Sequence, residues 1–310
     1  MEMSYLGNTG LKISRLGIGL AEIGYQLTSE NILEASSLLN TAIDNGINFL
    51  DTSTCYGVSE ELIGKTVSSR RKEYILATKC GHSPKRKPFE KHPEDWLQST
   101  VEQNINTSLN RLKTDYVDLL QIHSCSLEIL EKGEIIETLQ KIRDSGKARF
   151  IGYSGDNQAA EYAMSLGVFD TLQTSFNLVD QKARHNLFPK IEKNNSGLII
   201  KRPIANASWR PVKRPIYGND DNYIDYYLDR ANAMIEMGPL LSEPPNPIEL
   251  AIGFVLSHNL VNTAIVGTRN NKHLLNNIAL LEKGIELDNN LINEIYSRFD
   301  KLGNDWVQMM

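Results

Sequence analysis

Short apolar runs alternate with longer segments of helical periodicity along the chain. This alternation is typical of parallel strands joined by crossover helices, because buried parallel strands are apolar on both faces. We predict strands at Leu16–Leu20, Asn48–Asp51, Tyr74–Thr78, Val117–His123, Ala148–Tyr153, Thr171–Ser175, Gly197–Lys201 and Asn262–Val266. Helices are predicted at Asn31–Asn45, Ser59–Val67, Asp95–Leu112, Glu134–Ser145, Asn157–Leu166, Gln181–Asn194, Pro247–His258 and Asn271–Glu282. The pattern therefore predicts a series of strand–helix units.

Three further segments lie outside these units. Gly7-Asn8-Thr9-Gly10 has the composition of a hairpin turn, so we predict a short N-terminal hairpin. The long loop Pro203 to Asn246 is rich in Pro, Asn and Tyr and contains an amphipathic piece at Tyr223–Met237. We expect a substrate lid here, although a helix packed on the barrel wall is the alternative. Residues Asp288–Met310 should add a helix and a tail that brings Trp306 to the same mouth.

The predicted units fit either one barrel or two doubly wound domains, and polar residues at the strand ends decide between them. Asp51, Lys79 and His123 stand at or just after the carboxyl ends of predicted strands, and Tyr56 lies on the loop after Asp51. The carboxyl ends of barrel strands meet around one mouth, which would bring these side chains together. We therefore predict one α/β domain over residues 1–310, a (β/α)8 TIM barrel.

The composition indicates which kinds of partner such a barrel would not bind. A chain of 310 residues with 41% hydrophobic residues can bury a large core. Its formal net charge of −5 gives no electrostatic reason to expect nucleic acid or an anionic membrane as a partner. No apolar run approaches the roughly 20 residues of a membrane span, and the opening residues lack the layout of a signal peptide. We expect a cytoplasmic protein.

The cysteines are Cys55, Cys80 and Cys125, and none has the C-x-x-C spacing of a zinc ribbon. Their odd number and spacing predict reduced thiols. Each lies within two residues of a polar residue singled out above, so oxidation or alkylation could block a site there. Packing as small apolar fillers is the favoured interpretation, because a reactive thiol needs exposure and a low pKa.

Asp51, Tyr56, Lys79 and His123 are together suited to carbonyl reduction. Hydride addition leaves an oxygen that needs a proton, and tyrosine, with a pKa of about 10, is a weak acid at neutral pH. An adjacent ammonium stabilises the tyrosinate, and a carboxylate keeps that ammonium charged and in place. An imidazole near the carbonyl can orient the substrate. Each residue alone could be structural, but the four together predict a site for carbonyl reduction.

Three stretches contain these residues: INFLDTSTCYGVSEELIG, ILATKCG and DLLQIHS. They resemble the signature segments of the aldo-keto reductases, as do the opening LGNTGLKISRLGIG and the late IVGTRNNKHLLNNIA. The resemblance covers nearly the whole chain, with the segments in the same order. It implies a TIM barrel that binds NADPH in extended form. It also implies that the four residues are the family's catalytic tetrad, with Tyr56 as the general acid.

The resemblance implies residues that contact the cofactor as well. Gly19 would lie where the backbone approaches it, and Ser154 and Gln173 would hold the nicotinamide carboxamide. The sequence departs from the family at Gly155, where Asn is common. This departure removes one side-chain contact and leaves Ser154 and Gln173 with more of that task.

A second departure follows the seventh predicted strand. The family usually has an aromatic residue that stacks on the nicotinamide, followed by Ser, whereas this chain has Lys201 and Arg202. We expect these cations to help hold the pyrophosphate, together with the backbone near Pro203, Ile204 and Asn206. The alternative is that one or both cations point elsewhere.

The last predicted strand leads into a turn that suits an anion. Backbone N–H groups of Gly267 and Thr268 lie where a strand leads into a helix, and Arg269 is placed to pair with a 2′-phosphate. The turn therefore favours NADPH over NADH. The adenosine end should extend to Lys272, His273 and Asn277.

Other functions account for fewer of these residues. Gly17-Ile18-Gly19 follows a strand as in a Rossmann dehydrogenase, but the next glycine is displaced to Gly24. A metal-dependent hydrolase would need clustered ligands, and we expect no metal, because the other histidines fall mostly on predicted loops and helices. These are His82, His92, His185, His258 and His273. A different class stays open: a cofactor-binding regulatory subunit that resembles the potassium-channel β subunits.

The sequence leaves the substrate open. We expect a small carbonyl compound, and an aldehyde, a ketone and a sugar all fit. Candidate aromatic walls are Tyr25, Trp96, Trp209, Tyr217 and Trp306, although ordinary packing is an equally good interpretation of each. The oligomeric state is open too.

Overall fold

Eight parallel strands form a closed barrel in the computed structural model, which describes residues 1–86, 90–211 and 222–309. The strands are β3 (Leu16–Gly19), β4 (Phe49–Asp51), β5 (Ile75–Cys80), β6 (Val117–His123), β7 (Ala148–Ser154), β8 (Thr171–Ser175), β9 (Gly197–Lys201) and β10 (Thr263–Gly267). They pair in chain order, and β10 closes the barrel by pairing with both β9 and β3. The predicted (β/α)8 fold is confirmed.

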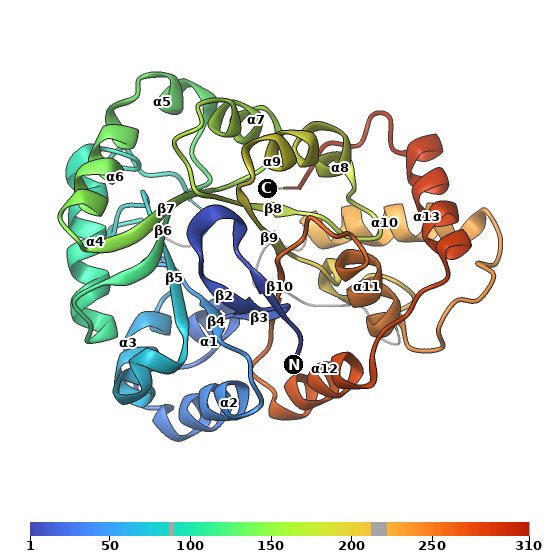
Figure 1. Cartoon of the computed structure of the whole chain (residues 1–310), viewed down its shortest axis with the longest axis horizontal. Helices are drawn as coiled ribbons and strands as arrows, with labels where there is room; N and C mark the ends of the chain where they lie inside the picture. Colours follow the sequence, from blue (N-terminus) through green and yellow to red (C-terminus); the bar gives the residue numbers. More distant parts are fainter. Residues whose placement is uncertain (87–89, 212–221, 310) are drawn as a thin grey trace.

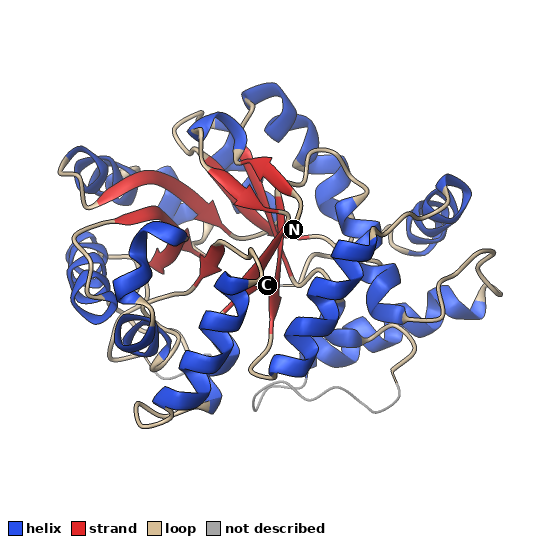
Figure 2. Cartoon of the chain, turned by 60° about the horizontal axis from the view of Figure 1, so that its bottom comes forward, coloured by secondary structure: helices blue, strands red, loops and turns tan. Residues whose placement is uncertain are grey.

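Helices surround the barrel (Figure 2). They are α1 (Ala21–Gln26), α2 (Ile32–Asp44), α3 (Ser59–Thr66), α4 (Gln98–Leu112), α5 (Leu127–Glu131), α6 (Glu134–Asp144), α7 (Asn157–Ser165), α8 (Lys182–Asn186), α9 (Phe188–Asn194), α10 (Asn222–Glu236), α11 (Pro247–Leu256), α12 (Asn271–Lys283) and α13 (Asn289–Leu302). Where one helix was predicted over Gln181–Asn194, the chain forms α8 and α9 instead. Pro189 lies in the first turn of α9 and has no N–H to continue a helix from α8.

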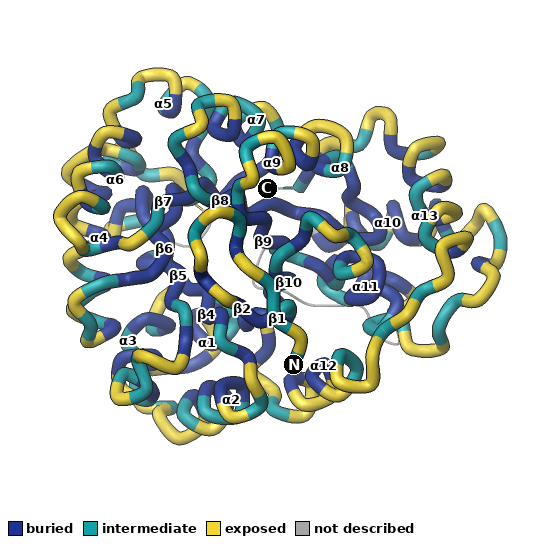
Figure 3. Tube along the Cα trace, in the orientation of Figure 1, coloured by how far each residue is buried: buried dark blue, intermediate teal, exposed yellow. Residues whose placement is uncertain are grey.

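The core has two layers. Apolar residues on the inner faces of the helices pack against the outside of the barrel, as Leu38, Leu39 and Ala42 of α2 do. A second cluster fills the barrel interior and includes Phe49 and Leu119. Figure 3 shows the barrel strands largely buried and the outer faces of the helices exposed, as the sequence pattern predicts.

A hairpin covers one end of the barrel. Strands β1 (Met3–Tyr5) and β2 (Lys12–Ser14) pair antiparallel and lie across the barrel in Figure 1. Leu6, Leu11 and Ile13 of this hairpin are buried against the interior cluster of the barrel. The predicted N-terminal hairpin is present, and it closes the end opposite the carboxyl ends of the strands.

The loop after β9 and the C-terminal segment contain the remaining elements. The loop begins with the 3-10 turn η3 (Ala205–Ala207), and α10 packs against α13. The tail after α13 is held at Gln308, whose amide donates to the carbonyl of Ser175 at 3.0 Å. Part of the predicted lid lies outside the described residues, so its closing over a substrate stays a prediction. No helix of the described ranges is long and apolar enough to cross a membrane.

Candidate active site

Asp51 and Lys79 form a buried ion pair at the mouth of the barrel. Asp51 ends β4 and Lys79 lies near the end of β5, and the two strands are neighbours. The Lys79 ammonium donates to Oδ2 of Asp51 at 2.6 Å and to the carbonyl of Thr52 at 3.0 Å. Both side chains are at most 3% exposed, so the ion pair is shielded from water and the ammonium is held in one position.

Tyr56 lies beside this ammonium on the loop between β4 and α3. Its ring centroid is 4.9 Å from Nζ of Lys79 and 5.6 Å from the ring of His123. The loop packs closely on α1, because a Cβ at Gly24 would lie 2.1 Å from the carbonyl oxygen of Tyr56. The fold therefore brings together all four residues that the sequence singled out.

Gln173 and Ser154 connect to the same carboxylate. The Gln173 amide donates to Oδ1 of Asp51 at 2.8 Å and accepts from the Ser154 hydroxyl at 2.9 Å. The amide of Gln121 on β6 also donates to Oδ1 of Asp51, at 3.4 Å. Gln121 was not predicted as a site residue, although its position two residues before His123 places both side chains on one face of the strand.

His123 ends β6 and is surrounded by groups from neighbouring loops. The indole N–H of Trp96 donates to its backbone carbonyl at 2.9 Å, and the ring of His82 lies 4.6 Å away. Burial lowers the pKa of His123, and the nearby His82 and Lys79 lower it further. Burial also lowers the pKa of His82, to about 4. Both imidazoles are therefore neutral at physiological pH.

A cavity of about 340 Å³ lies at the carboxyl ends of the strands. Of the predicted site residues, its walls include Gly19, Asp51, Tyr56, His123, Ser154, Gln173, Lys201, Arg202, Pro203, Ile204, Asn206 and Gly267. Glu22, which the sequence did not single out, also lines it. The cavity therefore runs from Asp51 and Tyr56 to the segment that follows β9.

Lys201 and Arg202 both have protein partners. The Lys201 ammonium lies 2.7 Å from Oδ2 of the buried Asp156, and the Arg202 guanidinium donates to the backbone carbonyl of Met309. Burial opposes ionisation of Asp156, but Lys201 outweighs it and the pKa of this carboxyl is lowered. Asp156 was missed, although it follows a predicted strand by three residues and so met the criterion that selected the tetrad.

The turn after β10 places Arg269 near two carboxylates. Its guanidinium lies 3.4 Å from Oε1 of Glu34, and both side chains are half-exposed. Burial raises the pKa of Glu22, and Arg269 and His273 partly oppose that shift. Other predicted residues of this end lie close by: the Thr268 hydroxyl accepts from the N–H of Asn270 at 3.1 Å, and Asn277 is buried in α12.

Most of the predicted aromatic walls pack within the protein. Besides its bond to His123, Trp96 lies against the ring of His82. Trp209 is buried and its indole donates to Glu243 at 2.8 Å, and Trp306 packs on Phe299. Tyr25 is exposed and lies 5.8 Å from the Tyr56 ring, between centroids. Tyr217 lies outside the described residues.

A sequence model of the aldo/keto reductase family matches residues 15–297. The chain belongs to the aldo/keto reductase family. The oxidoreductase YqkF of Bacillus subtilis is 29% identical in an alignment of 293 positions that covers 90% of each chain. L-Galactose dehydrogenase of Arabidopsis thaliana is 26% identical in an alignment of 326 positions that covers 98% of this chain and 96% of the relative.

Solved structures agree with this assignment. The holo form of aldo-keto reductase AKR11C1 from Bacillus halodurans superposes with a TM-score of 0.78, at 25% identity over 96% of each chain. Aldo/keto reductases are oxidoreductases that use nicotinamide cofactors. The family accounts for the barrel.

The cavity of this aldo/keto reductase has the walls that a nicotinamide cofactor needs. Gly19 and Gly267 are paired at the ends of β3 and β10 and both line the cavity. A Cβ added at either glycine would meet only the other strand's backbone, at 3.5 Å or more. The two glycines thus leave space beside bare backbone, where a cofactor can approach closely. The residues present fit the group.

Proposed function

We propose that this aldo/keto reductase uses NADPH to reduce the carbonyl group of an aldehyde, ketone or sugar, with Tyr56 as the general acid. The observation that carries the proposal is the Lys79 ammonium, which is bonded to Asp51 and lies beside the Tyr56 ring. Such a cation stabilises the tyrosinate that remains when the phenol has given up its proton.

The four residues would have separate roles in the reduction. A bound nicotinamide would supply the hydride. Tyr56 would donate its hydroxyl proton to the substrate oxygen as that oxygen becomes negative. His123, which lines the cavity and is neutral, would orient the carbonyl by a hydrogen bond. Asp51 and Lys79 are positioning residues, because they act on the substrate through Tyr56.

The cofactor would lie along the wall that begins at Ser154 and Gln173. These side chains already bond to one another, and a carboxamide could add to that pair because the Ser154 oxygen can still accept. We propose NADPH rather than NADH, because Arg269 is half-exposed beside the anion-binding turn and can pair with a 2′-phosphate. Lys201 and Arg202 would add positive charge beside the pyrophosphate while they keep their present partners.

Turnover of a panel of small aldehydes, ketones and aldose sugars tests the proposal, with NADPH oxidation followed by absorbance. We expect saturable oxidation with at least one class. Tight NADPH binding with no turnover across the panel would instead favour the regulatory subunit that the sequence left open.

A further inference from the structure

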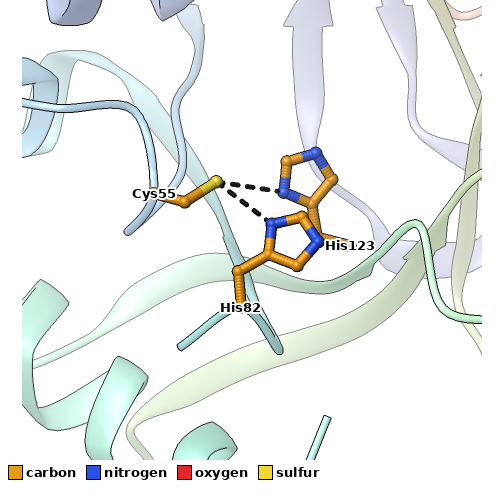
Figure 4. Close-up of side chains that lie close together, drawn as sticks. All are labelled: Cys55, His82 and His123. Carbon is orange, nitrogen blue, oxygen red and sulfur yellow. Dashed lines mark hydrogen bonds between the residues drawn. The ribbon is translucent and has the colours of Figure 1, made fainter. Parts of the chain in front are cut away.

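Cys55, His82 and His123 bring one sulfur and two imidazoles together beside the tetrad. They come from three segments: the loop after β4, the loop after β5 and the end of β6. Figure 4 shows the sulfur facing one nitrogen of each ring. Sγ of Cys55 lies 3.3 Å from Nδ1 of His82 and 3.5 Å from Nδ1 of His123. One ligand-type atom of each residue lies within 4.8 Å of the other two.

Hydrogen bonding leaves this cluster incompletely satisfied. A thiol has one proton, so Cys55 can donate to only one of the two Nδ1 atoms at a time. Nε2 of His82 is buried and has no hydrogen-bond partner within the described part of the chain. His82 itself is only 8% exposed, so water reaches it poorly. Oγ of Ser53 lies 3.3 Å from Nδ1 of His123 and 3.2 Å from Sγ of Cys55, so this hydroxyl is a further partner of the cluster. A metal ion would give all three side chains one common partner.

The spacing is close to what a tetrahedral ion requires. Zn²⁺ binds sulfur at about 2.3 Å and imidazole nitrogen at about 2.0–2.1 Å, which separates sulfur from nitrogen by about 3.5–3.6 Å and nitrogen from nitrogen by about 3.3–3.4 Å. The two S···N distances of 3.3 and 3.5 Å come within about 0.3 Å of the first value. The two ring centroids lie 4.6 Å apart with the ring planes at 33°, so both imidazoles would have to turn for their lone pairs to point at one ion.

We propose that Cys55, His82 and His123 form a binding site for Zn²⁺. On binding, the thiol would release its proton to solvent as the sulfur–metal bond forms, and no oxidation state would change. The ion would bind each imidazole through a nitrogen that carries no proton. Three protein ligands leave a fourth position for water.

The ion would bind His123 on the ring nitrogen that faces away from the substrate. The metal would occupy Nδ1 of His123, and Figure 4 shows the other ring nitrogen of His123 pointing away from Cys55 and His82. A neutral imidazole bound through Nδ1 has its proton on Nε2. The ion would therefore fix His123 in the tautomer that can donate a hydrogen bond from Nε2. This last step rests on the proposed function, whereas the metal site does not.

Titration of the reduced full-length chain with Co²⁺ tests the site, because cobalt replaces zinc in such sites and is coloured. We expect a thiolate-to-cobalt charge-transfer band that saturates at one ion per chain and disappears when Zn²⁺ is added. Cys55→Ser and His82→Asn should abolish the band. Cys125→Ser and His185→Asn change a thiol and an imidazole outside the cluster and should keep it.

The absence of a saturable band in the wild-type protein would overturn the proposal, and this result needs no variant to fold. A band that survives in Cys55→Ser, or that vanishes in Cys125→Ser, would assign the metal to another thiol and overturn it too. Circular dichroism confirms that each variant is folded. The readout requires neither cofactor nor turnover, so its failure is distinguishable from failure of the proposed carbonyl reduction.

Discussion

At the scale of single residues, the Asp51 carboxylate connects two parts of the site. One oxygen accepts from Lys79, beside Tyr56, and the other accepts from Gln173, which bonds to Ser154. The sequence predicted these residue types at the strand ends, because a barrel gathers those ends at one mouth. It did not predict the bond between Gln173 and Asp51, which depends on side-chain directions across the barrel. A change at Asp51 is therefore expected to disturb both the proton donor and the carboxamide site.

Asp180 should make the free energy of unfolding depend on pH. Burial, and then the nearby Asp156, raises the pKa of Asp180 from 3.8 to about 7. Between those values the folded state holds a proton that the unfolded state has lost, so the free energy of unfolding falls as pH rises. Asp180→Asn removes this loss. It should be more stable than wild type by on the order of 2–4 kcal/mol at pH 8, with little difference near pH 4, in urea unfolding.

A matched surface variant, Asp305→Asn, removes an exposed carboxylate and should show no such pH dependence. The explanation fails if Asp180→Asn differs from wild type by the same amount at both pH values. That pattern would mean that the amide acts through packing, or through the bond that Asp180 accepts from the N–H of Met309.

Arg269 should determine the preference for NADPH. A charge-assisted bond to a phosphate contributes roughly 1.5–3 kcal/mol, so Arg269→Ala should lower kcat/KM with NADPH by about tenfold or more. Efficiency with NADH, which lacks that phosphate, should change little. Steady-state kinetics with both cofactors and one good carbonyl substrate provide the measurement.

Glu34→Gln is the control for Arg269, because it removes the half-exposed partner and keeps the guanidinium. It should retain the preference for NADPH. Equal loss of efficiency with both cofactors in Arg269→Ala, or equal use of both by the wild-type enzyme, would contradict this role.

At the scale of elements, the N-terminal hairpin closes the barrel through Gly7. Gly7 has φ +50°, and a Cβ there would lie 2.3 Å from the backbone nitrogen of Gly197. Gly7→Ala therefore combines backbone strain with a clash and should lower the free energy of unfolding by about 2–4 kcal/mol. Gly10 has φ +70° with open space around it, so Gly10→Ala should cost only about 1 kcal/mol.

Denaturant unfolding of both glycine variants checks this prediction, and turnover at low temperature should be unchanged because the site lies at the other end. Equal destabilisation by the two substitutions would show that the close approach to Gly197 contributes nothing beyond the strained φ angle.

Strands and helices could be predicted where the hydrophobic periodicity is strong. They were predicted less well where a single residue ends an element that the periodicity would continue. Most strands were predicted closely because they are short apolar runs, as β6 and β9 are; β8, with the sequence TLQTS, is an exception. The division into α8 and α9 depends on Pro189. The hydrophobic periodicity of Gln181–Asn194 continues across this proline, so it predicts one helix. The course of the segment after β9 was not predictable, because Arg202, Asn206 and other residues there adopt positive φ angles that favour glycine.

At the scale of the whole molecule, barrel closure explains which site residues could be predicted from the sequence, and loop geometry explains which could not. Closure places neighbouring strand ends side by side, so Asp51, Lys79 and His123 could be grouped from their positions alone. The Lys201–Asp156 pair and the approach of His82 to Cys55 join segments through loop geometry. Loop geometry leaves no periodic pattern in the sequence, so the partners of Lys201 and the cluster behind His123 became visible only in the structure.

The central claim is that Tyr56 supplies the proton, and Tyr56→Phe tests it most directly. The matched control is Tyr25→Phe, which removes the hydroxyl of a neighbouring tyrosine. The ring centroids of Tyr25 and Tyr56 lie 5.8 Å apart. We predict that Tyr56→Phe binds NADPH with an unchanged dissociation constant, measured by fluorescence, while kcat falls by about 10²–10⁴-fold. Tyr25→Phe should keep near-normal turnover. A Tyr56→Phe enzyme that reduces the carbonyl at the wild-type rate would contradict the account.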